Sequence, residues 1–339
     1  MQVAEQFRRL PEIKRRRIEM PPHTMRLNRL ERPEPWSHEL WARAALSMTH
    51  VDWYLYPDYL KFYRRLAEFV EVSEREIVVG AGIEEFIRSF MMLHQGRRVA
   101  VLWPTCLMFE IYARAFGVEL VKIPTPCSIE DVARNVSVDA ILLVNPGQPF
   151  ETCFQPEEIQ WLCRAFPDAW IAVDEAYHGF GAPTVLGDHR VYPNLMVLRT
   201  FSKAFGAAGI RLGYAVGARR TLDYLDAVRP SGEVSGLSMA VATVLMDNPE
   251  AVEAGVAEVM AGREWLRARF AEVGYVVRGE WGNHVLVETT QAVKIVHDLQ
   301  EIGVLVRLVD EQHFMVTCGS VDTMRRFWIA FGRPWEFAS

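Results

Sequence analysis

The sequence predicts an α/β fold in which a large domain with a mainly parallel sheet precedes a smaller α/β domain. The first observation is an apolar, partly β-branched run from Trp170 to Val173 that ends in Asp174, which is typical of a strand buried on both faces. The second is a short strand, a glycine turn and a helix start within residues 76–91. The third is the length of 339 residues, 50% of them hydrophobic, which suits one large domain with a companion.

Composition argues against several classes of partner. The formal net charge of −6 leaves no broad excess of lysine and arginine to neutralise phosphates, so nucleic acid is not an expected partner. No apolar stretch approaches the ~20 residues that span a bilayer, and the start of the chain lacks the apolar run of a secretory signal. The five cysteines are scattered without metal-ligand spacing. We therefore expect a cytoplasmic protein with reduced thiols, no bound metal and no membrane partner.

The positions of prolines and the spacing of apolar residues divide the chain into three predicted segments. Prolines break any long helix near the start, so residues 1–45 are predicted to form an irregular N-terminal arm. Residues 46–235 would form the large domain. Residues 236–339 would contribute two linking helices, as far as about residue 273, and a small C-terminal domain. In that domain we expect alternating strands and helices, with strands at 275–278, 285–288, 304–308 and 314–318, a helix at 292–303 and another from Val321.

The strand at residues 76–80 leads through a glycine turn into a helix. The N-terminus of such a helix offers free backbone N–H groups and a positive dipole end to an anion. Gly82, Ile83 and Glu84 are therefore predicted to cradle a phosphate. The acidic side chains of Glu84 and Glu85 fit this position if they face water.

Two further strands precede the buried run at Trp170. Residues 98–103 form the first, and a helix is expected to open at Pro104. Residues 139–144 form the second, which runs into a proline-containing loop over residues 145–150.

Residues 199–214 place a single lysine, Lys203, among small and hydroxyl residues, with Arg211 eight positions on. A lysine that forms a Schiff base needs a lowered pKa and open space around its amine, and the small neighbours leave room for a planar cofactor. Ser202 and Arg211 would hold the phosphate of that cofactor. If the cofactor has a pyridine ring, the Asp174 carboxylate would keep its nitrogen protonated. The Tyr177 hydroxyl would donate a hydrogen bond to an oxygen on that ring. Taken alone, the stretch also fits a surface lysine in a loop.

These motifs, in this order and spacing, resemble the pyridoxal-phosphate-dependent aminotransferases of fold type I, class I/II. The resemblance is strongest to the histidinol-phosphate aminotransferase group and covers nearly the whole chain from about Asn28. It implies the fold of these transferases and pyridoxal 5′-phosphate as cofactor. It makes Lys203 the Schiff-base lysine, pairs Asp174 with the pyridine nitrogen and Tyr177 with the ring hydroxyl, and assigns these three to catalysis. The phosphate ligands that it implies are Thr200, Ser202 and Arg211.

The resemblance also implies a homodimer with shared active sites. Residues 54–58 are similar to the family's Tyr-Pro-Asp motif, whose tyrosine reaches the cofactor phosphate of the neighbouring subunit. Tyr56 would be that tyrosine. The alternative is an aromatic side chain that anchors the turn before Pro57.

Two positions around the cofactor ring depart from the family pattern. Cys106 stands where an aromatic residue usually stacks on the ring. Either Phe109 or Trp103 takes over that contact, or the ring is covered less completely. Gln148 replaces the asparagine that normally bonds the ring hydroxyl, and its longer amide can still donate a hydrogen bond there.

The substrate side departs further. Met315 occupies the place of the arginine that holds the substrate carboxylate in most of these enzymes, and a thioether forms no bidentate pair with a carboxylate. Arg307 is the remaining candidate cation, although it also fits a surface strand. Asn28 lies near a weak match to the family's Asn-Glu-Asn-Pro motif. Asn283, followed by His284, falls where the family has Asn-Phe at the substrate pocket.

The resemblance predicts an aminotransferase that acts on a small amino acid or amine of a biosynthetic pathway, with Lys203 as the acid–base. A decarboxylase, an elimination or cyclisation enzyme, or an oxidase-type enzyme on a modified amino acid would keep Lys203, Asp174 and Tyr177 and change the substrate residues. Met315, Cys106 and Gln148 favour this alternative. A non-catalytic binding module is disfavoured because Lys203 and Asp174 are both present.

Overall fold

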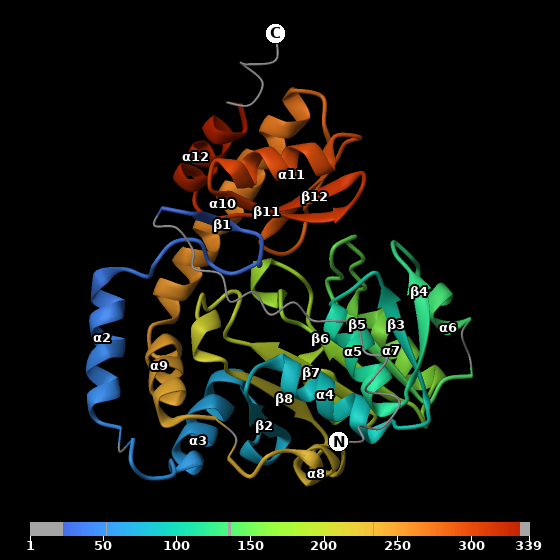
Figure 1. The fold of residues 1–339 in the computed structure, drawn as a ribbon. Helices are drawn as coiled ribbons and strands as arrows, with labels where there is room; N and C mark the ends of the chain where they lie inside the picture. The colour runs from blue at the N-terminus through green and yellow to red at the C-terminus, as the bar shows by residue number, and fades with distance from the viewer. Residues whose placement is uncertain (1–22, 52, 135–136, 233, 333–339) are drawn as a thin grey trace, which may run out of the picture.

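A seven-stranded sheet forms the centre of the larger lobe in the computed structural model, which describes residues 23–51, 53–134, 137–232 and 234–332 (Figure 1). In spatial order its strands are β2 (Ile77–Gly80), β8 (Gly213–Gly217), β7 (Leu195–Thr200), β6 (Trp170–Asp174), β5 (Ala140–Val144), β3 (Arg98–Trp103) and β4 (Glu119–Pro124). Strand β8 is antiparallel to both of its neighbours, and the other pairs are parallel. The carboxyl ends of β5, β6 and β7 therefore meet at one edge.

Helices cover both faces of this sheet, which explains why its central strand is apolar throughout. Ala172 of β6 faces the cluster formed with α4 (Ile83–Leu93), α5 (Leu107–Phe116) and α8 (Arg219–Val228). Ile171 and Val173 face the other layer. The helices of that layer are α3 (Tyr59–Val70), α6 (Ile129–Ala133), α7 (Pro156–Ala165) and α9 (Gly236–Met246). The prediction of a strand buried on both faces is confirmed. The α5 helix, expected from Pro104, begins at Leu107.

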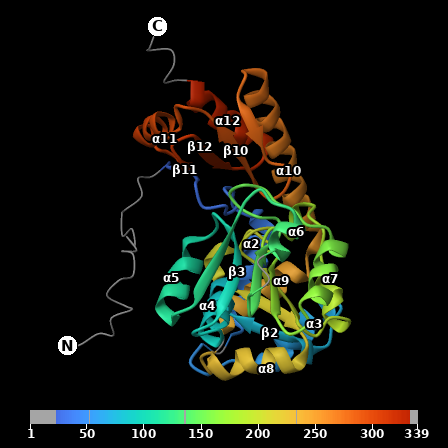
Figure 2. The ribbon, with the colours of Figure 1, turned by 90° about the vertical axis from the view of Figure 1, so that its right-hand side faces the viewer.

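A second sheet of five strands forms the smaller lobe. Its order is β1 (Met25–Leu27), β11 (Val304–Asp310), β12 (His313–Thr317), β10 (His284–Glu288) and β9 (Val276–Arg278). The helices of this lobe are α10 (Pro249–Glu272), α11 (Ala292–Glu301) and α12 (Val321–Gly332). The long α10 connects the two lobes in Figures 1 and 2, and the ring of Phe270 near its end lies 6.1 Å from that of Phe314. Helices α9 and α10 fall in the stretch where two linking helices were predicted, and β9–β12 with α11 and α12 fall in the stretch where a small α/β domain was predicted.

The N-terminal segment differs from the predicted irregular arm. Residues 25–27 form β1, which pairs in parallel with β11 of the small lobe. Residues 38–49 form α2 (His38–Thr49), which begins at the Ser37 N-cap and packs beside α9 (Figure 1). The expectation of an irregular arm up to residue 45 was therefore wrong for these stretches, and residues 1–22 lie outside the described ones. Between β1 and α2 the chain crosses from one lobe to the other.

Candidate active site

A cavity of about 630 Å³ opens where the carboxyl ends of the central strands meet the small lobe and the crossing N-terminal segment. Most of the predicted site residues line it. These residues are Ile83, Glu84, Cys106, Gln148, Asp174, Tyr177, Thr200, Ser202, Lys203, Arg211 and Arg307. They come from separate segments of the chain between positions 83 and 307, and the fold brings them to one place.

Lys203 lies in this cavity on the loop between β7 and β8. Its Nζ donates a hydrogen bond to the backbone carbonyl of Arg29 at 3.2 Å and stands 5.6 Å from the centre of the Tyr177 ring. Burial lowers the pKa of the Lys203 amine to about 8, and Arg211 acts in the same direction, against Glu31 and Asp174. More of the amine is thus in its neutral, nucleophilic form than for a lysine in water.

Asp174 is the last residue of β6, and its carboxyl group points into the same cavity. Its Oδ1 accepts a hydrogen bond from the Ala176 N–H at 3.0 Å. Burial raises the pKa of Asp174 to about 7, although the nearby Lys203 opposes the shift. The next residue, Glu175, turns away and binds Arg199 at 2.9 Å. A carboxylate held this way favours a cationic partner in the cavity.

The N-terminus of α4 lies beside Arg211 and is a candidate anion site. Gly82 is the N-cap of this helix with a φ of 87°, and a β-carbon at this glycine would stand 2.8 Å from Nη2 of Arg211. The guanidinium therefore reaches the free N–H groups of the helix because residue 82 has no side chain. Thr200 Oγ1 lies 2.9 Å from Ser202 Oγ on the adjoining wall. Helix N–H groups, two hydroxyls and a guanidinium make a set of donors that fits a phosphate.

The two glutamates at the start of α4 behave differently from each other. Glu84 is exposed and accepts a hydrogen bond from the Tyr112 hydroxyl at 2.8 Å. Glu85 pairs with Arg229 at 3.0 Å, and these side chains are only 9% and 2% exposed. The condition that these carboxylates face water is therefore met by Glu84 but not by Glu85. Its charge is compensated by Arg229, so it does not oppose an anion at the helix end.

Gln148 lines the cavity with an unsatisfied amide. Both Nε2 and Oε1 are buried and have no hydrogen-bond partner among the described residues. Buried amides are rarely left unpaired, so this side chain fits a ligand that both fills the cavity and accepts a hydrogen bond. Of the two residues considered as a cover in place of Cys106, Phe109 lines the cavity, whereas Trp103 carries Lys122 Nζ at 3.6 Å from its ring centre.

Five predicted residues are not among the described residues that line the cavity. One is Gly82, the N-cap of α4, which precedes the lining residue Ile83. The other four are Tyr56, Asn28, Asn283 and Met315. Tyr56 is 94% exposed on the outer surface. Asn28 is half-buried, and its Oδ1 has no partner in the described part of the chain. Asn283 is buried and donates to the carbonyl of Leu30 at 3.0 Å, which fixes the crossing segment. Met315 is 0% exposed, in the core of the small lobe.

Sequence reasoning missed the contribution of the crossing segment. Arg29 and Glu31 both line the cavity, and the carbonyl of Arg29 is the hydrogen-bond acceptor of Lys203. Glu31 pairs with Arg26, whereas the Arg29 side chain has no ion pair with any described residue. No local pattern marks these positions, because they reach the cavity only through the pairing of β1 with β11.

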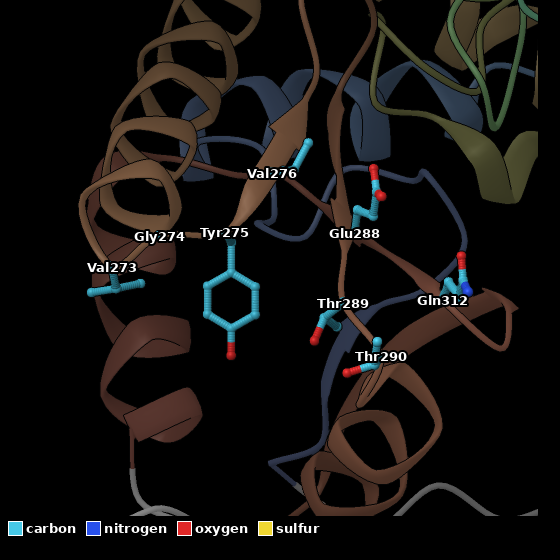
Figure 3. A pocket seen from close by; sticks show the side chains of 8 residues that line it. All are labelled: Val273, Gly274, Tyr275, Val276, Glu288, Thr289, Thr290 and Gln312. Carbon is cyan, nitrogen blue, oxygen red and sulfur yellow. The ribbon is translucent and has the colours of Figure 1, made fainter.

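A second hollow of about 530 Å³ lies at the outer end of the small lobe (Figure 3). The side chains around it, from Val273–Val276 and Glu288–Thr290 with Gln312, do not line the cavity that holds Lys203. The predicted catalytic residues Lys203, Asp174 and Tyr177 all line the Lys203 cavity, and none of them lines this second hollow. Within the described residues, no helix is long and apolar enough to cross a membrane.

Comparison with known proteins identifies the family. The family model described as aminotransferase class I and II matches residues 28–333. This chain belongs to that family. Its relatives include histidinol-phosphate aminotransferases from Symbiobacterium thermophilum, 31% identical over 322 residues that cover 89% of this chain and 88% of the relative, and from Thermotoga maritima, 30% identical over 239 residues that cover 70% of each.

Solved structures show the same fold. Histidinol-phosphate aminotransferase from Sinorhizobium meliloti in complex with pyridoxal-5′-phosphate superposes with a TM-score of 0.87 at 19% identity, over 98% of this chain and 96% of that one. L-threonine-O-3-phosphate decarboxylase from Porphyromonas gingivalis gives a TM-score of 0.82 at 20% identity, over 91% and 99%. The predicted family, fold class, enzyme class and cofactor are confirmed: the chain is a pyridoxal-phosphate-dependent transferase with the type I fold.

Proposed function

We propose that this chain is an aminotransferase that transfers the amino group of a small amino acid or amine by means of Lys203. The observation that carries the proposal is the position of the Lys203 amine, in a cavity that also receives the Asp174 carboxyl and the phosphate-type donor set at Arg211. Family membership supports the same reaction class.

Each part of the cavity suits one part of the cofactor. Asp174 would pair with the ring nitrogen, Gln148 and Tyr177 with the ring oxygen, and the start of α4 with the phosphate together with Arg211. Thr200 and Ser202 complete the phosphate ligands. When bound, the cofactor supplies an electron sink for the charge that develops on the substrate carbon.

Lys203 would act twice. Burial keeps its pKa near 8, so the neutral amine is available to bond covalently to the cofactor. When not bonded to the cofactor, Nζ would be the base that takes a proton from the substrate carbon bearing the amino group. The Arg29 carbonyl, which accepts a hydrogen bond from Nζ in the structure, would hold it within the cavity.

Two cations at the cavity mouth would bind the substrate anion in place of the missing strand arginine. Arg307 and Arg29 both line the cavity, and neither forms an ion pair with a described residue. They come from neighbouring segments, because Leu27 of β1 is paired with Val306 of β11. A carboxylate or phosphate on the substrate would be held there by charge-assisted hydrogen bonds.

A homodimer with shared sites is part of the proposal. Trp53 and Tyr56 are 82% and 94% exposed, and Tyr54 and Leu55 between them are exposed as well. A run of large exposed apolar side chains marks an interaction surface. Tyr56 would reach from this surface to the cofactor phosphate of the partner subunit.

A second reaction on the same cofactor is favoured by one observation. Met315 is fully buried, so the position that would carry a carboxylate-binding arginine offers no charge to a substrate. Decarboxylation, elimination with cyclisation, or oxidation of a modified amino acid would use the same Lys203 and Asp174. The fold is shared by a decarboxylase, L-threonine-O-3-phosphate decarboxylase.

Trapping and product analysis test these proposals. Borohydride reduction of the cofactor-loaded enzyme should attach the cofactor to Lys203 in wild type and to no residue in Lys203→Ala. An adduct at another lysine would overturn the assignment. Incubation with a panel of amines and amino acids, followed by mass analysis of products, separates the reactions. A keto product with the cofactor left in its amine form supports transamination, whereas loss of CO₂ or a cyclised product supports the second reaction.

A further inference from the structure

His284 is a buried histidine that the proposed reaction does not use. It is 0% exposed, and neither ring nitrogen has a hydrogen-bond partner among the described residues. A buried imidazole without partners loses its hydration and gains nothing in return, so such a residue is rarely retained for packing alone. It is the first residue of β10 and stands opposite Thr317 of β12.

The face of the sheet on which His284 lies is the face that meets the cavity. Side chains at alternate positions of a strand share one face, as do directly opposed residues of neighbouring strands. Leu286 is opposite Met315, and Met315 is opposite Arg307, which lines the cavity. His284 shares this face, whereas Phe314 points the other way, toward Phe270.

The unpaired amide of Gln148 lies next to this imidazole. A β-carbon built on Gly282 would stand 3.2 Å from His284 Nδ1 and 3.3 Å from Gln148 Nε2, so the two side chains flank the same glycine. The carboxylate of Glu151 accepts hydrogen bonds from the backbone N–H groups of Glu280 and Trp281, both at 2.9 Å. This clamp ties the loop that carries Gln148 to the turn that precedes His284.

The surroundings of His284 keep its ring neutral. Burial lowers the pKa of His284 to about 3, and the cations Arg263, Arg307 and Lys203 act in the same direction. A neutral imidazole has one N–H donor and one acceptor nitrogen. Its donor matches the Oε1 acceptor of Gln148. In the structure Nε2 is the amide atom beside Gly282, so a half-turn of the amide would bring Oε1 to the side of His284 and direct the NH₂ group into the cavity.

We propose that His284 is a positioning residue that fixes the Gln148 amide, so that the NH₂ group of Gln148 donates to the ring oxygen of the bound cofactor. The inference rests on the role proposed above for Gln148. A free amide can rotate to present either end, and only one end is a donor. By holding Oε1, His284 would keep the donor facing the ring at all times.

The absorbance of the bound cofactor tests the inference without any substrate. A hydrogen-bond donor to the ring oxygen stabilises the form of the bound cofactor that has lost a proton, so removing the donor raises the pH midpoint of its absorbance change. Gln148→Ala should raise this midpoint by about one pH unit, a tenfold change in proton affinity. His284→Phe should raise it in the same direction. In the double variant the midpoint should equal that of Gln148→Ala, because the imidazole acts through the amide.

Matched variants exclude a general effect of altering the small lobe. His313→Phe changes another histidine of the same sheet, whose ring packs against Phe150 of the Gln148 loop at 5.1 Å, and should leave the midpoint unchanged. His284→Asn retains an N–H donor and should shift the midpoint less than His284→Phe. Thermal unfolding of cofactor-free His284→Phe shows whether this variant folds. If this variant does not fold, His284→Leu repeats the removal.

Several results would overturn the inference. One is an unchanged midpoint in His284→Phe while Gln148→Ala shifts it. Another is an equal added shift by His284→Phe in the Gln148→Ala background, because the imidazole would then act independently of the amide. An unchanged midpoint in Gln148→Ala also overturns the inference, because Gln148 would then not donate to the ring oxygen. None of these results alters the trapping of the cofactor on Lys203, so the proposed function is tested separately.

Discussion

Arg307 on β11 stands directly opposite Met315 on β12, and Arg307 lines the cavity whereas Met315 is fully buried. Directly opposed side chains of an antiparallel pair lie on one face. The charge at the mouth of the cavity is therefore offered by residue 307, one strand away from the position where the family resemblance places an arginine.

We predict that Arg307→Ala weakens the reaction with the true substrate. Loss of a charge-assisted hydrogen bond to a substrate anion should lower kcat/KM by an amount equal to roughly 1.5–3 kcal/mol of transition-state free energy. Arg278→Ala is the matched control, because Arg278 is an exposed arginine of the same sheet that does not line the cavity. Steady-state kinetics decide the question. A loss below about 0.5 kcal/mol, or an equal loss in both variants, would assign Arg307 a structural role.

Met315→Arg is predicted to damage the protein rather than to create a carboxylate site. The side chain at 315 is fully buried beside Arg307, so a guanidinium there would be an unpaired charge next to another cation. Such a change costs roughly 3 kcal/mol or more. Met315→Leu, which keeps the volume nearly constant, should cost less than about 1.5 kcal/mol. Thermal unfolding measures both. A stable Met315→Arg enzyme that reacts with glutamate would show instead that position 315 opens to the substrate.

Sequence reasoning succeeded where a local pattern carries the information. The run that ends in Asp174 is apolar because helices cover both faces of β6. Consecutive apolar residues are a local pattern, so the sequence alone reveals this burial. The strand, glycine turn and helix at Gly82 depend on a left-handed φ that favours glycine. These two motifs and the Lys203 loop carried the family resemblance, which in turn implied the fold and most of the residues that line the cavity.

The remaining features depend on contacts between distant parts of the chain. The three residues of β1 form a strand only because β11, far along the chain, pairs with them, so no local signal distinguishes them from an irregular arm. Arg29 reaches the cavity through the same pairing. The burial of Met315 and the isolation of His284 follow from how the lobes meet, which single residue types do not encode.

Asp174→Asn should leave the protein folded and able to bind cofactor but slow the reaction about a thousandfold, the loss expected when roughly 4 kcal/mol of transition-state stabilisation disappears. A neutral amide no longer favours the protonated ring nitrogen. Single-turnover rates with a reactive amino substrate, at saturating cofactor, measure the chemical step. Near-normal rates would contradict the role assigned to this carboxylate.

The same residue should give the cofactor-free protein a distinctive pH dependence. Burial raises the pKa of Asp174 to about 7, above its value of ~3.9 in an unfolded chain, so the folded state holds more protons between these limits. Stability contributed by this group is therefore complete below about pH 4 and falls as the pH rises toward 7. Asp174→Asn lacks this loss, and its unfolding temperature relative to wild type should increase from pH 5 to pH 8. If the difference in unfolding temperature between the variant and wild type stayed constant over this pH range, the pKa of Asp174 would not be raised in the folded protein.

The shared-site homodimer predicts that two defective variants repair each other. If Tyr56 serves the cofactor phosphate of the partner subunit, a mixed dimer of Lys203→Ala and Tyr56→Ala contains one native site, which combines Lys203 of one subunit with Tyr56 of the other. Random exchange makes half of the dimers mixed, so activity should return to about one quarter of wild type. Tyr59→Phe is a suitable control for the region, because the Tyr59 hydroxyl donates within the same chain to the Val234 carbonyl at 3.2 Å. Co-refolding followed by activity and sedimentation measurements tests this. Mixed dimers without recovered activity would show that Tyr56 does not serve the partner's site. An active monomer would exclude shared sites altogether.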